Sequence, residues 1–234
     1  MPSDRHPDPA AWRDAVLRHQ TSLEEAADAA RECRACRLWE RGTQTVFGTG
    51  AKHARLMLIG EQPGDREDKI GKPFVGPAGQ LLDEALKMAG IDRRTTYLTN
   101  VVKHFSWEER GKRRIHQKPK VDEIRACRPW LEAELAAVEP ELVVCLGATA
   151  AQVLLGPSFR VTQERGRVLR SPLAPRVLAT VHPSSILRAE DDETREQELQ
   201  RFIADLTFAS KVMRDGLRDT GLGFDGGATV ERHD

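Results

Sequence analysis

The sequence predicts a single α/β domain, a three-layer α/β/α sandwich around a mostly parallel sheet of four strands. Short apolar runs alternate along the chain with stretches of helical periodicity, which is the pattern of such a fold. The apolar runs are continuous, as expected for strands that are buried on both faces. The 234 residues, 39% hydrophobic and 31% charged, are enough for one globular domain with a full core.

The individual elements follow from periodicity and from the glycines that end them. Leu56–Gly60 is an apolar run ending in glycine, which is typical of a buried strand that leads into a loop. Further strands are predicted over residues 97–102, 142–146 and 177–181. Helices are predicted over residues 10–34, 78–88, 121–138, 148–155 and 184–217, the last with breaks among residues 190–193. The domain is expected to span residues 1–215, and the polar, glycine-rich residues 216–234 are expected to form a disordered tail.

Charge and cysteine content limit the possible functions. The chain carries 36 basic and 36 acidic side chains, so no overall field attracts nucleic acid and any contact with DNA must be local. The N-terminal residues lack the apolar core of a secretory signal, and the apolar stretch Leu142–Leu155 is too short to span a bilayer. We expect a cytoplasmic monomer without a membrane partner. Its four cysteines are then metal ligands or buried thiols rather than disulfides.

Three predicted strands end in polar residues that carry possible chemistry. Glu61 follows the first strand, Asn100 lies at the end of the second, and His182 follows the fourth. Each residue alone is also typical of an ordinary loop or turn. Ligands of open α/β sheets bind beyond the carboxyl ends of the strands, so the joint placement favours one site for a polar heterocycle.

Two segments of the chain carry a resemblance to a known family. Residues 60–64 (GEQPG), followed by residues 71–79 (GKPFVGPAG), resemble the first motif of the family four and five uracil-DNA glycosylases. Residues 182–188 (HPSSILR) resemble their second motif, and with Asn100 and the cysteines the similarity spans about residues 33–208. Residues 111–117 (GKRRIHQ) resemble the basic, histidine-bearing loop of the UdgX class, whose members form covalent adducts with uracil-containing DNA.

The resemblance implies excision of uracil from DNA, with single-stranded DNA favoured and free uracil released. Phe74 would stack on the extruded base, although a phenylalanine of this kind can also be part of the core. The side-chain amide of Asn100 would match the O4 and N3–H edge of uracil. Cytosine presents the opposite pattern there and would leave buried groups unsatisfied, at about 1–3 kcal/mol each. Gln62, Gly64 and Asp65 are expected to complete the contacts with the base.

The resemblance also implies roles in breaking the glycosidic bond. His182 would donate a hydrogen bond to uracil O2 and stabilise the departing anion. His116 would attack C1′ of the deoxyribose with one ring nitrogen, while Glu61 orients the ring and accepts the proton of the other nitrogen. The resulting neutral imidazole glycoside has no good leaving group. The resemblance therefore implies a single-turnover reaction that leaves the protein bonded to DNA.

Residues 103–120 hold an excess of basic side chains in an otherwise neutral chain. Such a run is often a solvated surface, but the aromatic residues among these cations suit single-stranded DNA. The start of the helix after His182 can bind phosphate through its backbone N–H groups. The residues expected to contact DNA are Lys103, Lys112, Arg113, Arg114, Ser184, Ser185 and Arg188.

The cysteines are candidate metal ligands. Cys33 and Cys36 have the spacing of a ligand pair, whereas Cys127 and Cys145 lie far along the chain in a predicted helix and strand. Ligand count alone leaves zinc, an iron-sulfur cluster and inert buried thiols open. The resemblance implies a [4Fe-4S] cluster held by all four cysteines, with a structural role.

Two other functions fit the same sequence. A conventional glycosylase with multiple turnovers would use water in place of His116, which would then contact only phosphate. A non-catalytic, metal-dependent nucleic-acid binding module would use the cysteines and the basic segment without any chemistry on the base.

Overall fold

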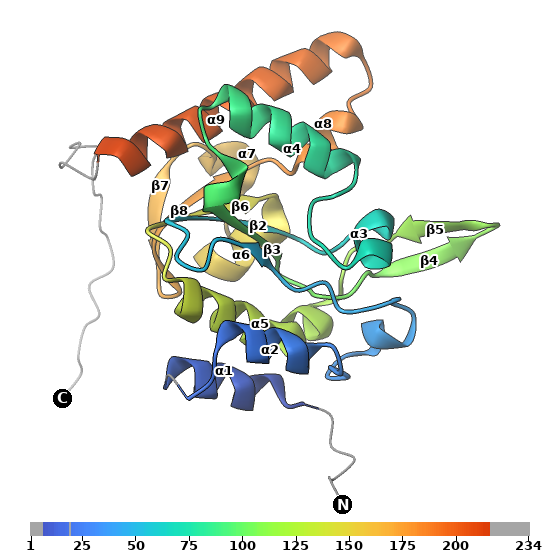
Figure 1. The fold of residues 1–234 in the computed structure, drawn as a ribbon. Helices are drawn as coiled ribbons and strands as arrows, with labels where there is room; N and C mark the ends of the chain where they lie inside the picture. The colour runs from blue at the N-terminus through green and yellow to red at the C-terminus, as the bar shows by residue number, and fades with distance from the viewer. Residues whose placement is uncertain (1–6, 19, 216–234) are drawn as a thin grey trace, which may run out of the picture.

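A mixed sheet of six strands forms the centre of the fold. The computed structural model describes residues 7–18 and 20–215 (Figure 1). The strand order is β1-β3-β2-β6-β8-β7, and the pairs β2–β3, β2–β6 and β6–β8 are parallel. The strands are β1 (Thr49–Gly50), β2 (Leu56–Gly60), β3 (Thr96–Asn100), β6 (Leu142–Leu146), β7 (Val168–Ser171) and β8 (Ala174–Thr180).

The structure confirms the predicted α/β class and the four parallel strands, but the predicted number of strands is wrong. The antiparallel strands β1 and β7 form the two edges of the sheet. Both residues of β1 are exposed, and β7 is only half-buried, so neither strand has the continuous apolar run by which the others were found.

Helices cover both faces of the sheet. They are α1 (Pro9–Leu17), α2 (Leu23–Ala30), α3 (Asp65–Ile70), α4 (Pro77–Met88), α5 (Val121–Val138), α6 (Ala148–Leu155), α7 (Val161–Glu164), α8 (Pro183–Leu187) and α9 (Asp192–Asp215), with 3₁₀ turns η1 (Arg37–Glu40) and η2 (Arg93–Thr95). Helices α4, α8 and α9 pack on one face of the sheet and α5 and α6 on the other, with α1 and α2 outside α5 (Figure 1). No helix in the described ranges is long and apolar enough to cross a membrane. The tail expected over residues 216–234 lies outside the described residues.

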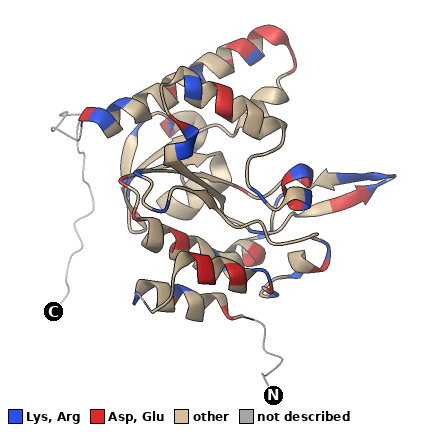
Figure 2. Ribbon diagram, viewed as in Figure 1, with Lys and Arg blue, Asp and Glu red and all other residues tan. Residues whose placement is uncertain are grey.

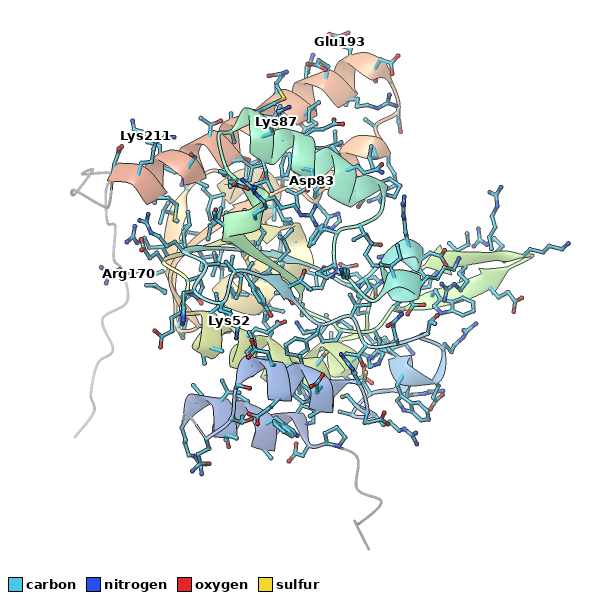
Figure 3. All side chains as sticks on the ribbon, viewed as in Figure 1. Lys52, Asp83, Lys87, Arg170, Glu193 and Lys211 are labelled. Carbon is cyan, nitrogen blue, oxygen red and sulfur yellow. The ribbon has the colours of Figure 1, made fainter. Side chains whose placement is uncertain are left out.

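Strand β2 shows why the parallel strands are apolar throughout. Met57 and Ile59 belong to the core on the α5 side, while Leu56 and Leu58 belong to the core on the α4 side. Successive side chains of a strand point to opposite faces, so a strand covered on both faces is apolar at every position. The outer surfaces of the helices are polar: Lys87 on α4, and Glu193 and Lys211 on α9, lie exposed to solvent (Figure 3).

A two-stranded hairpin projects from the body between β3 and α5 (Figure 1). It consists of β4 (Trp107–Arg110) and β5 (Arg113–His116), joined by Gly111 and Lys112, and Gly111 has the positive φ of 63° that suits a tight turn. Basic side chains occupy β5 and the turn, whereas Glu108 and Glu109 lie on β4 (Figure 2). The hairpin therefore presents its positive charge along one strand and at its tip.

Lys103 and Glu134 form a fully buried ion pair between β3 and α5, with side chains 1% and 0% exposed. The Lys103 ammonium also donates to Thr99 Oγ1 and to the backbone carbonyl of Asn100, both at 2.7 Å. Glu134 accepts further hydrogen bonds from Gly48 N–H and from the hydroxyls of Tyr97 and Thr99. The prediction that Lys103 contacts DNA is wrong, because its side chain lies in the core.

We predict that breaking this pair is costly. Lys103→Met leaves the Glu134 carboxylate without its cation, and Glu134→Gln leaves a buried ammonium, so each should lower the free energy of unfolding by about 3–5 kcal/mol. The double variant should be less destabilised than the sum of the two, because removing the second charge removes an uncompensated ion. Urea unfolding of the four proteins measures this coupling.

The exposed pair Lys52–Glu24 is the control. Its side chains are 74% and 55% exposed, so Glu24→Gln should cost less than about 1 kcal/mol. Additive losses in the Lys103 and Glu134 variants would contradict the interpretation of Lys103–Glu134 as an energetically coupled pair.

Candidate active site at the carboxyl ends of the strands

Glycine at position 60 lets two candidate base-binding residues approach each other. A Cβ atom built on Gly60 would lie 2.4 Å from Asn100 Oδ1 and 2.7 Å from Phe74 Cζ. The amide of Asn100 and the ring of Phe74 therefore both lie against the backbone at the end of β2, and both residues are buried. The structure brings together these two residues, which the sequence placed in separate segments.

Phe74 is held in an unusual backbone conformation. Its φ is 54°, in the left-handed region that residues with a side chain rarely adopt. The loop after it is fixed by the Glu67 carboxylate, which accepts from Val75 N–H at 3.0 Å and from Gly76 N–H at 2.7 Å. The ring of Phe74 is nearly parallel to that of His182, with centroids 6.2 Å apart and 28° between the planes. The loop thus fixes an aromatic surface beside the imidazole.

His182 is the N-cap of α8, and this position determines its tautomer. Nδ1 accepts a hydrogen bond from Ser184 N–H at 3.1 Å, so the proton of the neutral ring is on Nε2. Burial, and after it the positive charges of Arg188 and His116, lowers the pKa of His182 to about 4. Near neutral pH the ring is therefore an uncharged N–H donor. Ser184 and Ser185, both expected to contact DNA, have their hydroxyls on His182 Nδ1 and on the His182 carbonyl, respectively.

His116, the last residue of β5, faces Glu61 at the end of β2. His116 Nε2 lies 3.7 Å from Glu61 Oε1, and the imidazole is half-exposed. Burial and the nearby Arg188 lower the pKa of His116, against the opposing effect of Glu61. A neutral imidazole keeps a lone pair on one nitrogen, which a nucleophile or a general base requires.

Two contacts hold the hairpin that carries His116. The Arg114 guanidinium binds Asp65 Oδ1 at 2.5 Å and Asp68 Oδ2 at 2.7 Å, on α3. The Gln62 side chain donates to the carbonyls of Ser106 and Gln117, which flank the hairpin, and accepts from Ser106 N–H. Arg114 was expected to contact DNA, and Gln62 and Asp65 to contact the base; the structure gives all three side chains partners within the protein.

Three other predicted residues differ in their freedom to bind a ligand. Lys112 and Arg113 lie exposed in the turn and at the start of β5. Gly64 begins α3, and its N–H donates to Glu67 at 3.2 Å. Lys112 and Arg113 are therefore accessible to a DNA strand, while Gly64 contributes to the loop that holds Phe74.

Three of the four cysteines form a group. Burial raises the pKa of Cys127 to about 12, and Cys36 and Cys33 add to the rise. Cys33 Sγ accepts from Trp130 Nε1 at 3.3 Å, and Cys127 Sγ accepts from Lys103 N–H at 3.2 Å. Cys145 is fully buried in the central strand β6, and burial alone raises its pKa. The described ranges contain no arrangement of three or more His, Cys, Asp or Glu side chains that could hold a metal ion.

A histidine that the sequence analysis left out of the ligand set lies beside this group. His104 follows Lys103 and is buried, and its Nε2 lies 3.0 Å from Thr45 Oγ1. The Thr45 hydroxyl donates to the Ala30 carbonyl, which also accepts from Cys33 N–H. His104 lies in the basic segment of residues 103–120, for which the sequence predicted contact with DNA and no metal binding. His104 follows the buried Lys103, so it lies inside the protein near the cysteines, and this burial is known only from the fold.

Thr149 was also missed. It follows the third parallel strand, β6, whose end was not among the three strand ends considered for chemistry. In the structure its hydroxyl donates to Glu61 Oε2. Thr149 lies three residues after the predicted strand 142–146, so the pattern of polar residues at strand ends could have identified it.

Comparisons with known proteins identify the family and relatives of this chain. A family model described as the uracil DNA glycosylase superfamily matches residues 47–207. The chain is similar to the type-4 uracil-DNA glycosylase of Thermotoga maritima, 36% identical over 179 residues, which are 76% of this chain and 90% of the relative. It is 34% identical to the type-4 enzyme of Sulfurisphaera tokodaii, over 71% of this chain and 76% of the relative. The type-5 enzyme of Pyrobaculum aerophilum is 29% identical, over 63% and 69%.

We predict that His182 makes stability depend on pH. Its pKa is about 4 in the folded state but 6.5 in the unfolded chain, so between these values the unfolded chain binds more protons. Stability should therefore fall as pH drops from about 6.5 to about 4, by up to roughly 1.4 kcal/mol per pH unit. Urea unfolding at a series of pH values measures the slope.

The matched variant is His182→Asn, which keeps a side-chain oxygen able to accept from Ser184 N–H but has no titrating ring. Its stability should vary less over this pH window than that of the parent. His53→Asn, at an exposed histidine, is the control. If the free energy of unfolding varied equally with pH in the parent and in His182→Asn, the pKa of His182 would be the same in the folded and the unfolded protein.

Proposed function

The chain belongs to the uracil-DNA glycosylase superfamily, and on that premise we propose that it excises uracil from DNA and ends covalently bonded to the product through His116. The observation that carries this proposal is the position of His116 Nε2, 3.7 Å from Glu61 Oε1 at the carboxyl end of β2. A histidine that only contacted phosphate would have no need of a carboxylate at this place.

The base-binding part of the proposal rests on Phe74 and Asn100. The Phe74 ring offers a stacking surface for an extruded base, and the Asn100 amide offers a donor and an acceptor to the O4 and N3–H edge of uracil. Gln62, Gly64 and Asp65 shape this pocket indirectly, because their polar groups hold the hairpin and the loop around α3. The selection of uracil over cytosine then depends on one fixed amide.

The leaving group is stabilised by His182. Since its Nδ1 accepts from Ser184 N–H, its Nε2–H is free to donate to uracil O2. A neutral donor suits this task, because the negative charge that develops on uracil strengthens the hydrogen bond in the transition state. Because burial, as the largest cause, lowers the pKa of His182 to about 4, the ring carries no second proton near neutral pH, and it stabilises the uracil anion by a hydrogen bond rather than by protonating it.

The covalent step exchanges one N-glycosidic bond for another. The bond between C1′ and N1 of uracil breaks, and its electron pair leaves with uracil. One nitrogen of neutral His116 donates its lone pair to C1′, and the N–H proton of the other nitrogen passes to Glu61. Glu61 then releases this proton to solvent and the uracil anion takes up one proton from solvent, so neutral uracil leaves and the product is a neutral imidazole glycoside. This product has no good leaving group, which makes the reaction single-turnover.

The exposed cations Lys112, Arg113 and Arg188 bind the DNA backbone in this proposal, whereas the N–H groups of Ser184 and Ser185 at the start of α8 donate to His182. The tip of the hairpin carries the first two, and Arg188 ends α8 beside the site. A hairpin that is attached at its base and charged at its tip suits a single strand that lies across the site. Binding is then expected to weaken with salt.

We assign the metal ligands to Cys33, Cys36 and Cys127, with His104 in the place first given to Cys145. The donor set fits an iron-sulfur cluster, since the three thiols are grouped and His104 is linked to the same loops through Thr45 and Ala30. A single zinc ion on the same donor set is the alternative, and the content of iron and sulfide distinguishes the two. A bound cluster would supply structural linkage between the N-terminal helices and α5, and no step of the reaction passes through it.

The test is incubation with a single-stranded oligonucleotide that contains one uracil. We expect a shifted band that resists SDS, together with released uracil, and no band with thymine in place of uracil. His116→Ser should abolish the band while keeping some excision. Glu61→Gln should slow band formation by roughly 100-fold, the usual effect of losing a general base. Mass spectrometry of the digested adduct should locate the sugar on the peptide that contains His116.

Other outcomes would replace the proposal. An abasic product without a band would identify a conventional glycosylase with multiple turnovers. Crosslinking by His116→Ser at the parent's rate would show that another side chain is the nucleophile. DNA binding without release of uracil would identify a non-catalytic binding module.

The ligand assignment makes a separate prediction. Cys127→Ala should lose most bound iron and acid-labile sulfide, together with the broad visible absorption of a cluster, whereas Cys145→Ala should keep them. His104→Ala should lower the iron content, and His104→Cys should restore it, because a thiolate is the commoner cluster ligand. Loss of iron from Cys145→Ala with retention in His104→Ala would return Cys145 to the ligand set.

A further inference from the structure

The start of α6 contacts the candidate active site, although no role has been assigned to it. Thr149, the second residue of this helix, has a buried side chain, and its hydroxyl donates a hydrogen bond to Glu61 Oε2. The other carboxylate oxygen, Oε1, is the one that lies 3.7 Å from His116 Nε2. The two oxygens of Glu61 therefore have different partners, on opposite sides of the carboxylate.

The position of Thr149 is fixed by the turn before it. Gly147 N–H donates to the Thr180 carbonyl at 2.9 Å, which joins the turn to the end of β8. Gly147 has a φ of 95°, and a Cβ built on it would lie 3.1 Å from His182 Cβ. The start of α6 is thus packed against the strand that carries His182. A hydroxyl attached there is a fixed donor rather than a mobile one.

The orientation of the Glu61 carboxylate matters for the covalent step. An ionised Glu61 is what the covalent step requires, because the carboxylate must accept the proton that leaves His116. A carboxylate free to rotate would present either oxygen, or neither, to the imidazole.

We propose that Thr149 is a positioning residue that fixes the Glu61 carboxylate by one oxygen and leaves the other directed at His116. This inference rests on the proposed function for its catalytic meaning, but the contact itself can be tested in the free protein. Thr149 touches neither base nor sugar in the proposed reaction, and its effect reaches the substrate only through Glu61.

The titration of His116 reports on the orientation of Glu61. The charged and titratable groups that act on this imidazole are Glu61, Arg188 and His182. Burial and Arg188 lower the pKa of His116, while Glu61 raises it. If Thr149 keeps the carboxylate in place, then removing its hydroxyl should let the carboxylate move away, and the pKa of His116 should fall.

The first experiment is an NMR titration of the His116 ring in the uncomplexed protein. Thr149→Val should shift the His116 titration to lower pH, in the same direction as Glu61→Gln, whereas Thr149→Ser should titrate like the parent. Thr207→Val removes a similar hydroxyl on α9, which donates only to the Ile203 carbonyl, and serves as the control. A His116 titration unchanged in Thr149→Val would overturn the inference.

The second experiment measures crosslinking and uracil release separately under single-turnover conditions. Thr149→Val should form the adduct roughly 10- to 100-fold more slowly, the loss expected for a hydrogen bond to a charged group, while uracil release falls less. The acid limb of its rate–pH profile, where protonation removes the neutral form of His116, should move to lower pH, and Thr149→Ser should restore both features. Equal losses in Thr149→Val and Thr149→Ser would mean that the methyl group packs the site and the hydroxyl orients nothing.

The two experiments separate this inference from the proposed function. A parent protein that releases uracil without an adduct, but whose His116 titration responds to Thr149→Val, would support the positioning role and refute the covalent mechanism. An adduct that forms equally well in Thr149→Val, with an unchanged titration, would support the covalent mechanism and refute the role of Thr149.

Discussion

The ion pair of Lys103 and Glu134 connects the parts of the molecule that the site depends on. The Lys103 ammonium fixes the carbonyl of Asn100, its backbone N–H contacts Cys127, and its carbonyl accepts from Val46 N–H. Two charges without water are expensive unless each is paired and hydrogen-bonded, and here both are. Asn100, the proposed base-binding residue, and the group of cysteines are therefore supported by one buried network, which couples the carboxyl ends of the strands to α5.

The hairpin reaches the site by a different route, because it has almost no core of its own. Arg114 joins it to α3, and Gln62 joins its base to the end of β2. Both contacts lie within a few residues of His116 along the chain or across the strands. A charged and solvated segment can thus deliver one side chain to a defined place, since polar contacts at its base replace the apolar burial that fixes ordinary strands.

The sequence predicted what depends on periodicity and motif, and missed what depends on three-dimensional partners. Strands β2 and β6 were predicted at their observed bounds because burial on both faces makes them apolar throughout. The hairpin was read as a loop because its strands are mostly charged. Lys103 was misplaced because composition cannot show that Glu134, far along the chain, neutralises it. Cys145 was grouped with the other cysteines through the family resemblance, and the sequence could not show that it is fully buried in the central strand.

The left-handed backbone conformation of Phe74 has an energetic cost that is met during folding rather than during ligand binding. Such a conformation costs about 1–3 kcal/mol for a residue with a side chain, and here Glu67 and the packing around α4 maintain it in the absence of DNA. The unfavourable backbone geometry is thus adopted when the chain folds, not when a nucleotide arrives. In the proposed reaction, a flipped base would meet a preformed stacking surface, and none of its stacking energy would be lost to reorganising the loop.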